Sequence, residues 1–441
     1  MKETITAQDL LAFEADYDAR NLRAVENAVC NVGLREASVN NDALRTLTHE
    51  FSIDIPAGEI TNQKQSGRCW MFAATNVFRL QVMKNLHIKN MELSQNYPLF
   101  FDKLEKANYF LESILETLEE DTSSRLIAHL LKDPMGDGGQ WDMFVNLVEK
   151  YGVCPKQCMP ETFTSSRTRD MDNYLTLKLR EFACTLRKGH EKGKDVASLR
   201  KLKKDMMATI YRILVLCLGK PPVEFNYEYK DNENQYHCIH STPKQFFDDY
   251  VQMNLRDYVS IINAPTKDKP FHRSFTVKFL GNVEGGNIVR YLNLPIKELK
   301  KLTLAQLKDN EVVWFGSDVG QFSTRTTGFL SQRAYDFENT LQTTFPMTKA
   351  ERLEYGESLM THAMVLTGVN LVKNKPTKWK VENSWGSDTG DKGFYLADDA
   401  WFDEFVYQVV INKKYLSQEQ LEAYESDPFE LEPWDPMGSL A

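Results

Sequence analysis

The sequence predicts an α+β fold, because helical patterns fill most of the first part of the chain and strand-like segments fill most of the second part. After about residue 271, short segments rich in Val, Phe, Tyr and Trp alternate with turns of Gly, Asn, Lys-Pro or Asp. The 441 residues are too many for one ordinary domain, and 42% of them are hydrophobic, which is enough for a packed core. A wholly disordered chain is therefore excluded.

Apolar residues at three- and four-residue spacing predict the helices. They are expected at residues 6–28, 70–86, 94–131, 141–151 and 165–220. The first helix is amphipathic and is expected to pack against the main body. The second is strongly apolar, which indicates a buried helix, and Cys69 lies where a polar loop enters it. The turn-rich segment 133–139 separates the third helix from the fourth.

The strands are expected at residues 275–280, 288–292, 312–317, 364–372, 379–381, 393–396 and 405–411. His362 opens one strand that should end near Val372, and Asn383 closes the next strand. The turn signal between these strands predicts a hairpin that brings His362 and Asn383 together. Their midpoint lies slightly before the turn signal, so we expect a bulge or irregular pairing in the hairpin.

The overall charge argues against a general polyanion-binding protein. Lys and Arg total 53 against 62 Asp and Glu, a formal net charge of −9. The apolar runs are far shorter than the ~20 residues of a membrane-spanning helix, and the N-terminal residues resemble no secretory signal. Seven cysteines, odd in number and unevenly spaced, are not typical of a disulfide framework. We therefore expect a reduced, intracellular protein with no membrane contact.

One stretch departs from the overall charge. Residues 165–204 carry twelve basic and five acidic side chains, a local balance of +7. Such a stretch is more often a solvated helix face than a nucleic-acid site, and no aromatic-interleaved motif accompanies it. Nucleic-acid binding therefore stays the weaker alternative for this region.

Three polar segments carry the candidate chemistry: residues 63–70 (QKQSGRCW), 361–364 (THAM) and 382–386 (ENSWG). The unpaired N–H groups at a helix N-terminus favour the thiolate of a cysteine placed there, and such sites lower the pKa from about 8.5 to roughly 3.5–7.5. A nearby imidazole can take the thiol proton, and an amide side chain can fix the tautomer of that imidazole. The three segments together therefore predict a cysteine nucleophile with a histidine base.

In these segments the chain resembles the papain-like cysteine peptidases. The resemblance implies that Cys69 is the nucleophile, that His362 and Asn383 complete the triad, and that Gln63 belongs to the oxyanion hole. Trp385 matches the indole that shields the His–Asn hydrogen bond. Five matching positions in the right order make chance a poor explanation.

The resemblance also implies substrate-binding residues. These are Gly138 and Gly139, which match a glycine pair that bonds the substrate backbone, together with Trp70, Trp385 and the C-terminal Ala441. No metal site and no cofactor are implied. The Cys154–Cys158 pair and the segment 237–240 hold soft ligands, but their spacings match no common zinc module.

Two departures from the papain-like pattern are informative. Ser66 stands where the family often has a disulfide-forming cysteine, and Arg68 replaces a small residue. The absence of that cysteine fits a reducing compartment. His362 lies 293 residues after Cys69 (362 − 69), whereas about 130–150 is usual. A long segment is therefore inserted, mostly after Gly139.

The size of the insertion, the forms of the motifs and the ending PWDPMGSLA are similar to the bleomycin hydrolase / aminopeptidase C family, over essentially the whole chain. This resemblance implies a cytoplasmic cysteine aminopeptidase that acts on peptides with a free N-terminus and assembles as a homohexamer. It divides the chain into a helical half with the nucleophile (1–164), a mainly helical, basic insertion with a role in oligomerisation (165–275), a β-rich half with His and Asn (276–427) and a C-terminal tail that reaches the active-site cleft (428–441).

The composition of the tail supports a role in specificity. From Glu419 onward the chain has acidic residues but no Lys or Arg, and it ends in small and apolar residues. A carboxylate one residue beyond the scissile bond would pair with the α-ammonium of a substrate and block longer chains. Two alternatives stay open: a nucleic-acid-binding ring that uses the basic insertion, and a thiol amidohydrolase or acyltransferase that acts on non-peptide amides.

Overall fold

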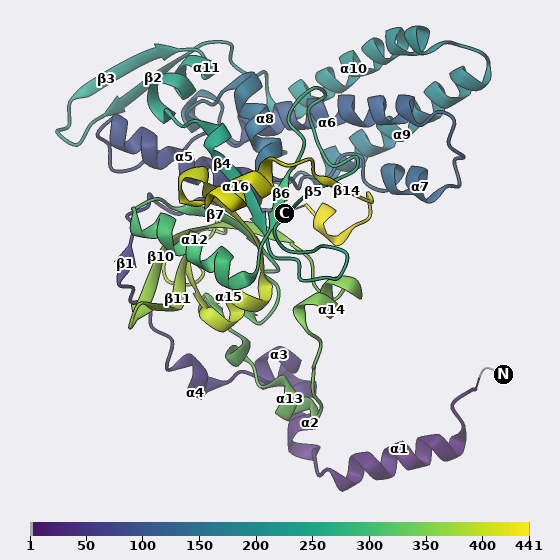
Figure 1. Ribbon diagram of the computed structural model, residues 1–441, viewed down its shortest axis with the longest axis vertical. Helices are drawn as coiled ribbons and strands as arrows, with labels where there is room; N and C mark the ends of the chain where they lie inside the picture. The colour runs from purple at the N-terminus through teal and green to yellow at the C-terminus, as the bar shows by residue number, and fades with distance from the viewer. Residues whose placement is uncertain (1–2, 441) are drawn as a thin grey trace.

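A mixed sheet of twelve strands, with helices packed above it and around its faces, forms the body of the protein in the computed structural model (Figure 1). The structure describes residues 3–440. The helices with the most buried residues come from the first part of the chain and most strands of the sheet from the second, so the predicted α+β fold is confirmed.

The helices of the body are α5 (Cys69–Asn85), α6 (Asn96–Glu116), α7 (Arg125–Lys132), α8 (Trp141–Tyr151), α12 (Ile296–Lys308), α13 (Phe337–Leu341), α14 (Lys349–Glu354), α15 (Asp399–Phe405) and α16 (Gln418–Glu425). Helices α5 and α8 match their predictions closely. The single helix predicted over residues 94–131 is wrong, because the chain breaks between α6 and α7. Asp121 accepts hydrogen bonds from Ser123 in that break, and the Ser124 side chain caps α7. Short 3-10 turns lie at Lys156–Cys158, Leu255–Asp257, Gln332–Ala334, Lys413–Tyr415 and Pro436–Gly438, and a π-helical turn lies at Phe247–Val251.

The strands of the large sheet are β1 (Ile53–Asp54), β4 (Tyr258–Ile262), β5 (Arg273–Val277), β6 (Tyr291–Asn293), β7 (Val313–Ser317), β8 (Ser323–Thr324), β9 (Phe329–Leu330), β10 (His362–Val372), β11 (Lys375–Glu382), β12 (Phe394–Asp398), β13 (Val406–Asn412) and β14 (Phe429–Leu431). Their order is β14-β5-β6-β4-β13-β7-β10-β11-β12-β9-β8, with β1 paired to β10. All seven predicted strands are present. The unpredicted ones are mostly two or three residues long, which leaves little pattern to detect.

The predicted hairpin joins β10 to β11. Its turn is Lys373 and Asn374, which both have positive φ, and Val372 pairs with Lys375. The register shifts at two places, between Leu366 and Gly368 and between Asn370 and Leu371, so the expected irregular pairing is confirmed. The opposite edge of β10 pairs with β7, where His362 faces Ser317.

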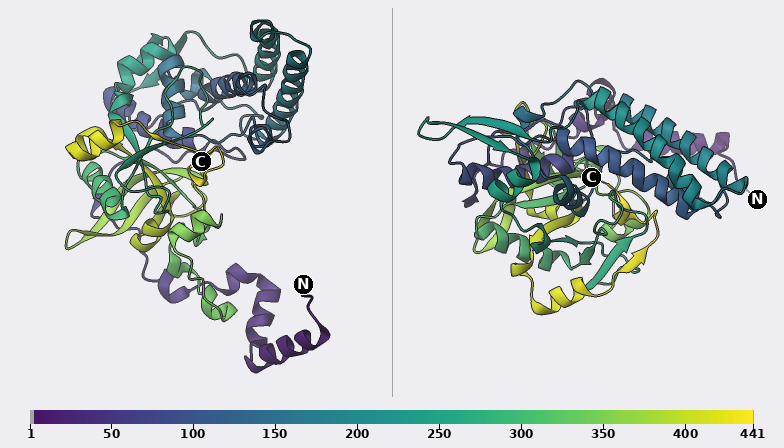
Figure 2. Two further views of the ribbon diagram at one scale, coloured as in Figure 1. Left: turned by 45° about the vertical axis from the view of Figure 1, so that its right-hand side comes forward. Right: turned by 90° about the horizontal axis from the view of Figure 1, so that it is seen from above.

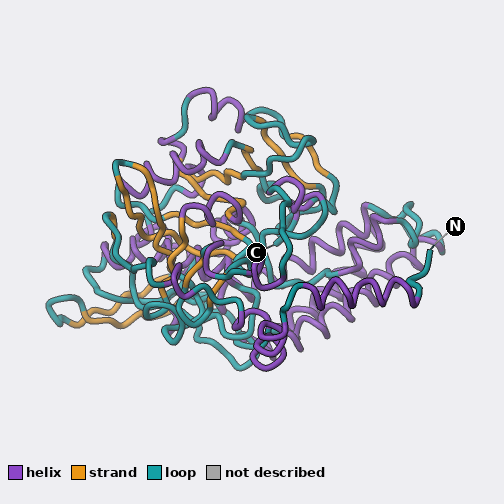
Figure 3. Tube along the Cα trace, turned by 90° about the horizontal axis from the view of Figure 1, so that it is seen from below, coloured by secondary structure: helices purple, strands orange, loops and turns teal. Residues whose placement is uncertain are grey.

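The segment between α8 and β4 has two parts that project from the body in different directions (Figures 2 and 3). The long helices α9 (Arg169–Glu191) and α10 (Val196–Leu218) extend to one side, and the hairpin β2 (Phe225–Lys230) and β3 (Tyr236–Ser241) extends to the other. The short helix α11 (Pro243–Phe246) and β4 follow, and β4 returns the chain to the large sheet.

The N-terminal arm, residues 3–44, extends from the body (Figure 2), and its last part is attached there, where the Asp336 N–H donates to the Ser38 carbonyl and the Asn40 N–H donates to the Ala334 carbonyl. It contains α1 (Ala7–Ala19), α2 (Arg23–Val32), α3 (Leu34–Ala37) and α4 (Asn41–Leu44). The prediction that residues 6–28 pack against the main body is wrong, because α1 and α2 bury no residue. The amphipathic pattern was correct about helix formation, but it does not specify which surface covers the apolar residues.

Candidate active site

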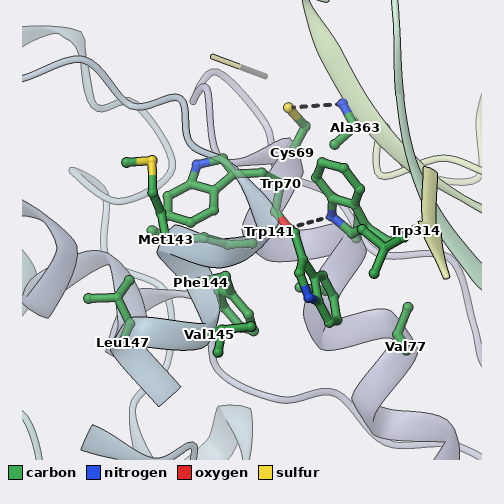
Figure 4. Packing of buried hydrophobic residues seen from close by; sticks show 14 of the residues in the cluster. Cys69, Trp70, Val77, Trp141, Met143, Phe144, Val145, Leu147, Trp314 and Ala363 are labelled. Atoms are coloured by element: carbon green, nitrogen blue, oxygen red, sulfur yellow. Dashed lines mark hydrogen bonds between the residues drawn. The ribbon is translucent and has the colours of Figure 1, made fainter. Parts of the chain in front are cut away.

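The candidate nucleophile lies at the N-terminus of α5, where the second half of the body meets the first (Figure 4). Cys69 is the first residue of that helix, and the Ala363 N–H donates to its sulfur across an N···S distance of 3.4 Å. Because Ala363 follows His362 at the start of β10, this contact brings the predicted nucleophile and base together from positions far apart in the sequence. Trp314, under the same helix, donates its indole N–H to the Trp70 carbonyl at 3.2 Å.

The hairpin of β10 and β11 joins His362 to Asn383. The His362 Nε2 lies 2.9 Å from the Asn383 Oδ1, and that oxygen also accepts the Ser384 N–H at 2.8 Å. Because the Asn383 Oδ1 accepts the Ser384 N–H, the atom that faces His362 is the amide oxygen and not the amide nitrogen. The His362 Nε2 therefore carries a hydrogen and donates it to this oxygen. The other ring nitrogen, Nδ1, is then the atom that can exchange a proton with Cys69.

Trp385 covers the histidine. The centroids of the Trp385 and His362 rings are 4.8 Å apart, and the Arg325 guanidinium lies 5.2 Å from the centroid of the Trp385 ring. The indole therefore contacts the imidazole directly, as the resemblance implied.

Gln63 reaches the site through a tight loop. Its Nε2 donates to the Ser66 carbonyl at 2.7 Å, and the Ser66 hydroxyl donates back to the Gln63 carbonyl at 2.7 Å. One of the two amide hydrogens holds the side chain in place, so the second is free to face a ligand. The Gln63 N–H also donates to the Ser384 carbonyl at 2.8 Å, which links this loop to the one that carries Asn383.

A buried ion pair joins the two halves behind the site. The Arg79 Nη2, on α5, lies 2.5 Å from the Glu382 Oε1, and the two side chains are 1% and 0% exposed. Glu382 directly precedes Asn383. The helix that carries the nucleophile and the strand that carries the orienting amide are therefore fixed to each other. Removing one partner of such a pair is strongly destabilising, because it leaves an unpaired buried charge.

Burial dominates the acid–base properties of the two central groups. It raises the pKa of the Cys69 thiol to about 11, although the N–H groups of Ala363, Trp70 and Cys69 itself lower that pKa. It also lowers the pKa of His362 to about 4, although the Asn383 hydrogen bond raises it. The N–H groups of the helix N-terminus act on the thiol pKa in the predicted direction, but loss of solvent outweighs them. Proton transfer from sulfur to imidazole creates both charges at once, and the surrounding hydrogen bonds favour both.

The two glycines predicted to bind substrate lie beside Trp70. A Cβ on Gly139 would lie 2.5 Å from the Trp70 ring, so only glycine fits there. The Gly138 carbonyl accepts from the Lys106 ammonium at 2.7 Å. Trp70 is fully buried, and its indole N–H donates to the Asp137 carbonyl at 2.8 Å. Trp70 therefore packs against the loop that contains Gly138 and Gly139. Because Trp70 is fully buried, its predicted role in substrate binding can be exerted only through that loop.

The C-terminal tail, residues 428–440, runs into the same region. The Gln140 Nε2 donates to the Ser439 carbonyl at 2.7 Å, and the Ser439 hydroxyl donates to the Met360 carbonyl at 2.7 Å. Gln140 follows the glycine pair in the helical half, and Met360 lies two residues before His362, so Ser439 touches both halves. Ala441, a predicted site residue, lies outside the described residues.

Two cavities differ in their relation to this site. A cavity of about 500 Å³ lies between the tail at Leu440, helix α6 and the loop 133–138. A cavity of about 590 Å³ lies between Val77 and Ile88, towards the far end of α5. Neither cavity is lined by the candidate catalytic residues, but the smaller one is lined by Gly138 of the predicted glycine pair.

Four of the twelve basic side chains in residues 165–204 contact the body. Arg180 donates to the last carbonyls of α7, and Arg187 donates to carbonyls that follow α6. Arg200 and Lys203 both pair with Glu112 on α6. These side chains cap helix ends and attach the insertion to the body. They are not free to bind nucleic acid, which weakens that alternative.

The other sequence signals have simple local roles. His237 pairs with Asp231, and His240 pairs with Asn226, within the hairpin of β2 and β3. Within residues 3–440, no three His, Cys, Asp or Glu side chains are grouped so as to hold a metal ion. None of the helices in that range is long and apolar enough to cross a membrane.

Three contacts of the site were missed from the sequence: the Ala363 N–H on the sulfur, the Gln140 amide on the tail, and the Asp137 carboxylate. The first is a backbone group, which carries no sequence signal. Gln140 and Asp137 flank the glycine pair, and their position beside a motif was the only available hint.

Comparisons with known proteins find similar chains and a family model that spans nearly the whole sequence. The Peptidase C1-like family model matches residues 4–438. Aminopeptidase C of Listeria monocytogenes is 50% identical, with 100% of both chains covered. Bleomycin hydrolase of Mus musculus is 42% identical, covering 93% of this chain and 92% of its own. The crystal structure of pepw from Lactobacillus rhamnosis hn001 is 52% identical, covers 100% of both chains and has a TM-score of 0.98.

Proposed function

The chain belongs to the Peptidase C1-like family and is a cysteine-type aminopeptidase with the papain-like fold, and we propose that Cys69, His362 and Asn383 carry out its reaction. The observation that carries this proposal is the contact between residues 69 and 363 beside the 2.9 Å bond between His362 and Asn383. These three side chains have the roles of nucleophile, base and orienting group.

In the first step, the Cys69 sulfur attacks the carbonyl carbon of the first peptide bond, and its proton passes to the His362 Nδ1. His362 then protonates the leaving amine, the C–N bond breaks, and a thioester stays on Cys69. In the second step, His362 takes a proton from water, which attacks the thioester and releases the N-terminal residue as a free acid. The Asn383 oxygen holds the imidazole and stabilises its charged form throughout.

The oxyanion is proposed to be stabilised by the free Gln63 amide hydrogen and by the Cys69 backbone N–H. The N–H groups of the first helical turn have no partner inside the helix, so they are available to a ligand. Donors of this type contribute about 10²–10³-fold to the rate. The hydrogen bonds between Gln63 and Ser66 support this role, because they hold the donor before substrate arrives.

The tail is proposed to restrict the enzyme to free N-termini. This proposal is supported by the contacts of Ser439 with Gln140 in the helical half and with Met360 in the β-rich half. A substrate chain extending beyond one residue would meet the tail. The carboxylate of the C-terminal residue would pair with the substrate α-ammonium.

Self-association is proposed from the N-terminal arm. Ile5, Leu10, Leu11 and Phe13 are all more than half exposed. Such an apolar surface on an extended arm is best covered by a second copy of the chain. Assembly as a hexamer and location in the cytoplasm are proposed from the family resemblance. The seven free cysteines support a reducing compartment.

The test compares wild type with Cys69→Ala on an aminoacyl-arylamide and on its N-acetylated form. We expect the variant to lose about 10³-fold or more, and wild type to prefer the free amine strongly. Wild-type activity in Cys69→Ala would contradict the assignment of the nucleophile. Equal hydrolysis of both substrates by wild type would contradict the role of the tail. Adding a competing amine and analysing the products distinguishes hydrolysis from acyl transfer.

A further inference from the structure

The loop that leads to the nucleophile is held in place by residues from other parts of the chain. The Gly67 N–H donates to the Asp137 Oδ2 at 2.7 Å, and the Arg68 guanidinium makes two hydrogen bonds to Glu161, at 3.0 and 2.8 Å. The Gln65 N–H donates to the Ser166 carbonyl at 3.0 Å. The seven cysteines, all within the described range, are free, so no disulfide holds this loop. Its position depends on these polar contacts.

Asp137 is the central group of this arrangement. Its carboxylate accepts from the Gly67 N–H and from the Thr168 hydroxyl, and its Oδ1 lies 2.8 Å from the Lys103 ammonium. Its backbone carbonyl accepts from the Trp70 indole. One residue therefore holds the chain on both sides of Cys69, at Gly67 and at Trp70.

Lys103 is shared by two carboxylates, and they differ in charge. It lies 2.8 Å from both Asp137 and Asp172. Burial opposes the charge of each carboxylate, but Lys103 and the donors from Thr168 and Gly67 hold the pKa of Asp137 well below its usual range. Burial and the neighbouring Asp137 raise the pKa of Asp172 to about 7. Asp137 is therefore the carboxylate that stays ionised at neutral pH.

The contact at Gly67 is close. A Cβ on Gly67 would lie 2.7 Å from the Asp137 Cβ, so the two backbones approach each other as only glycine allows. Asp137 also directly precedes Gly138 and Gly139 in the chain. The loop that supplies the oxyanion donors and the loop predicted to bind the substrate backbone are therefore joined at one carboxylate.

The charge of Asp137 does not itself activate the thiol. A negative charge at this place raises the pKa of Cys69, which disfavours the thiolate. Any benefit to the reaction therefore comes from the position that Asp137 gives to Gly67 and to the glycine pair.

We propose that Asp137 is a positioning residue. It fixes the oxyanion loop, residues 63–68, and the glycine pair in their places relative to Cys69. This inference rests on the proposed function. Displacing catalytic groups by about 1 Å can cost 10²-fold in rate, so the loss of this contact should affect the step that builds negative charge on the substrate oxygen.

The test uses Asp137→Asn, with Asp172→Asn as the matched control. Both variants remove a carboxylate from Lys103, but only the first changes the contact with Gly67. We expect Asp137→Asn to lower kcat about 10–100-fold with little change in KM, and Asp172→Asn to stay within about threefold. Thr168→Val, a milder change at the same carboxylate, should give an intermediate loss of kcat.

A second measurement separates positioning from general damage. Alkylation of Cys69 by iodoacetamide needs the thiol and His362 but no oxyanion donor, so its rate should not fall in Asp137→Asn. An aminoacyl aldehyde, which forms a tetrahedral adduct, should lose affinity in proportion to the loss of kcat/KM. Wild-type kcat in Asp137→Asn, or alkylation that falls in step with kcat, would overturn the inference. Activity that survives in Cys69→Ala would instead overturn the proposed function, so the two failures are distinguishable.

Discussion

The two ends of the chain differ in what holds them. The N-terminal arm forms regular helices, including a capping box between Thr6 and Asp9, yet α1 and α2 bury no residue. The C-terminal tail has one short strand and one 3-10 turn after residue 428, yet Met437 is 3% exposed. Hydrogen bonds within its own helices satisfy the backbone of the arm, whereas strand pairing and side-chain contacts with the body satisfy the backbone of the tail.

The contacts of the tail are numerous and specific. Strand β14 pairs in parallel with β5, and the Asp435 carboxylate forms an ion pair with the buried Lys269 ammonium at 2.7 Å. The Arg125 guanidinium lies 4.0 Å from the centroid of the Trp434 ring. The Tyr291 hydroxyl donates to the Met437 carbonyl at 3.2 Å. The comparison indicates that the tail has its partner within the chain, whereas α1 and α2 of the arm leave their apolar residues exposed.

The largest expected effect is from shortening the tail. Deletion of residues 439–441 removes the contacts with Gln140 and Met360, so N-acetylated peptides should enter the cleft. We expect kcat/KM for such peptides to rise by about 10²-fold, measured against the free-amine substrate as reference. Trp434→Ala, which removes the cation–π contact worth about 0.5–2 kcal/mol, should give a smaller rise. An unchanged cleavage profile after the deletion would show that the tail does not limit access.

Removing the arm should change the oligomeric state of the protein but not its catalytic activity. Without residues 1–32, the molar mass from light scattering should fall from that of an oligomer toward that of one shortened chain, which is below the 50.9 kDa of the full chain. Hydrolysis of a small arylamide should stay within about twofold, because surface changes far from a site have small effects. Leu11→Asp is the point-variant control. An oligomer that survives the deletion would assign self-association to another surface.

The smallest expected effect is a shift in pH dependence. His362 must be unprotonated to accept the thiol proton, and burial lowers its pKa from 6.5 to about 4. Activity should therefore persist as the pH falls through 6.5 and decline only near 4, with an apparent pKa that belongs to the Cys69–His362 pair. Shortening the tail should admit water and move this limb upward. A limb near 6.5 in the full-length enzyme would contradict the burial of His362.

Motif spacing and turn chemistry made much of the site predictable. Lys373 and Asn374 form the two-residue turn that brings His362 to Asn383, and the polar loop before Cys69 marks the start of α5. Local pattern was sufficient in both cases, because each element is formed by residues close in sequence.

The rest depended on contacts between distant residues. Asp137 meets Gly67 across 70 positions, and no local pattern indicates that pair. The thiol of Cys69 has a helix N-terminus beside it, but the burial that raises its pKa is a property of the assembled cleft. The apolar residues of α1 predict a helix correctly, but they do not predict that the helix buries none of its residues.

The most direct test of the account is covalent labelling of the full-length protein with an aminoacyl fluoromethyl ketone that has a free α-amine, followed by peptide mass spectrometry. The account predicts one adduct per chain, on Cys69, which is lost in His362→Ala and much slower when the reagent is N-acetylated. An adduct on another of the seven cysteines, or labelling that neither change affects, would contradict it.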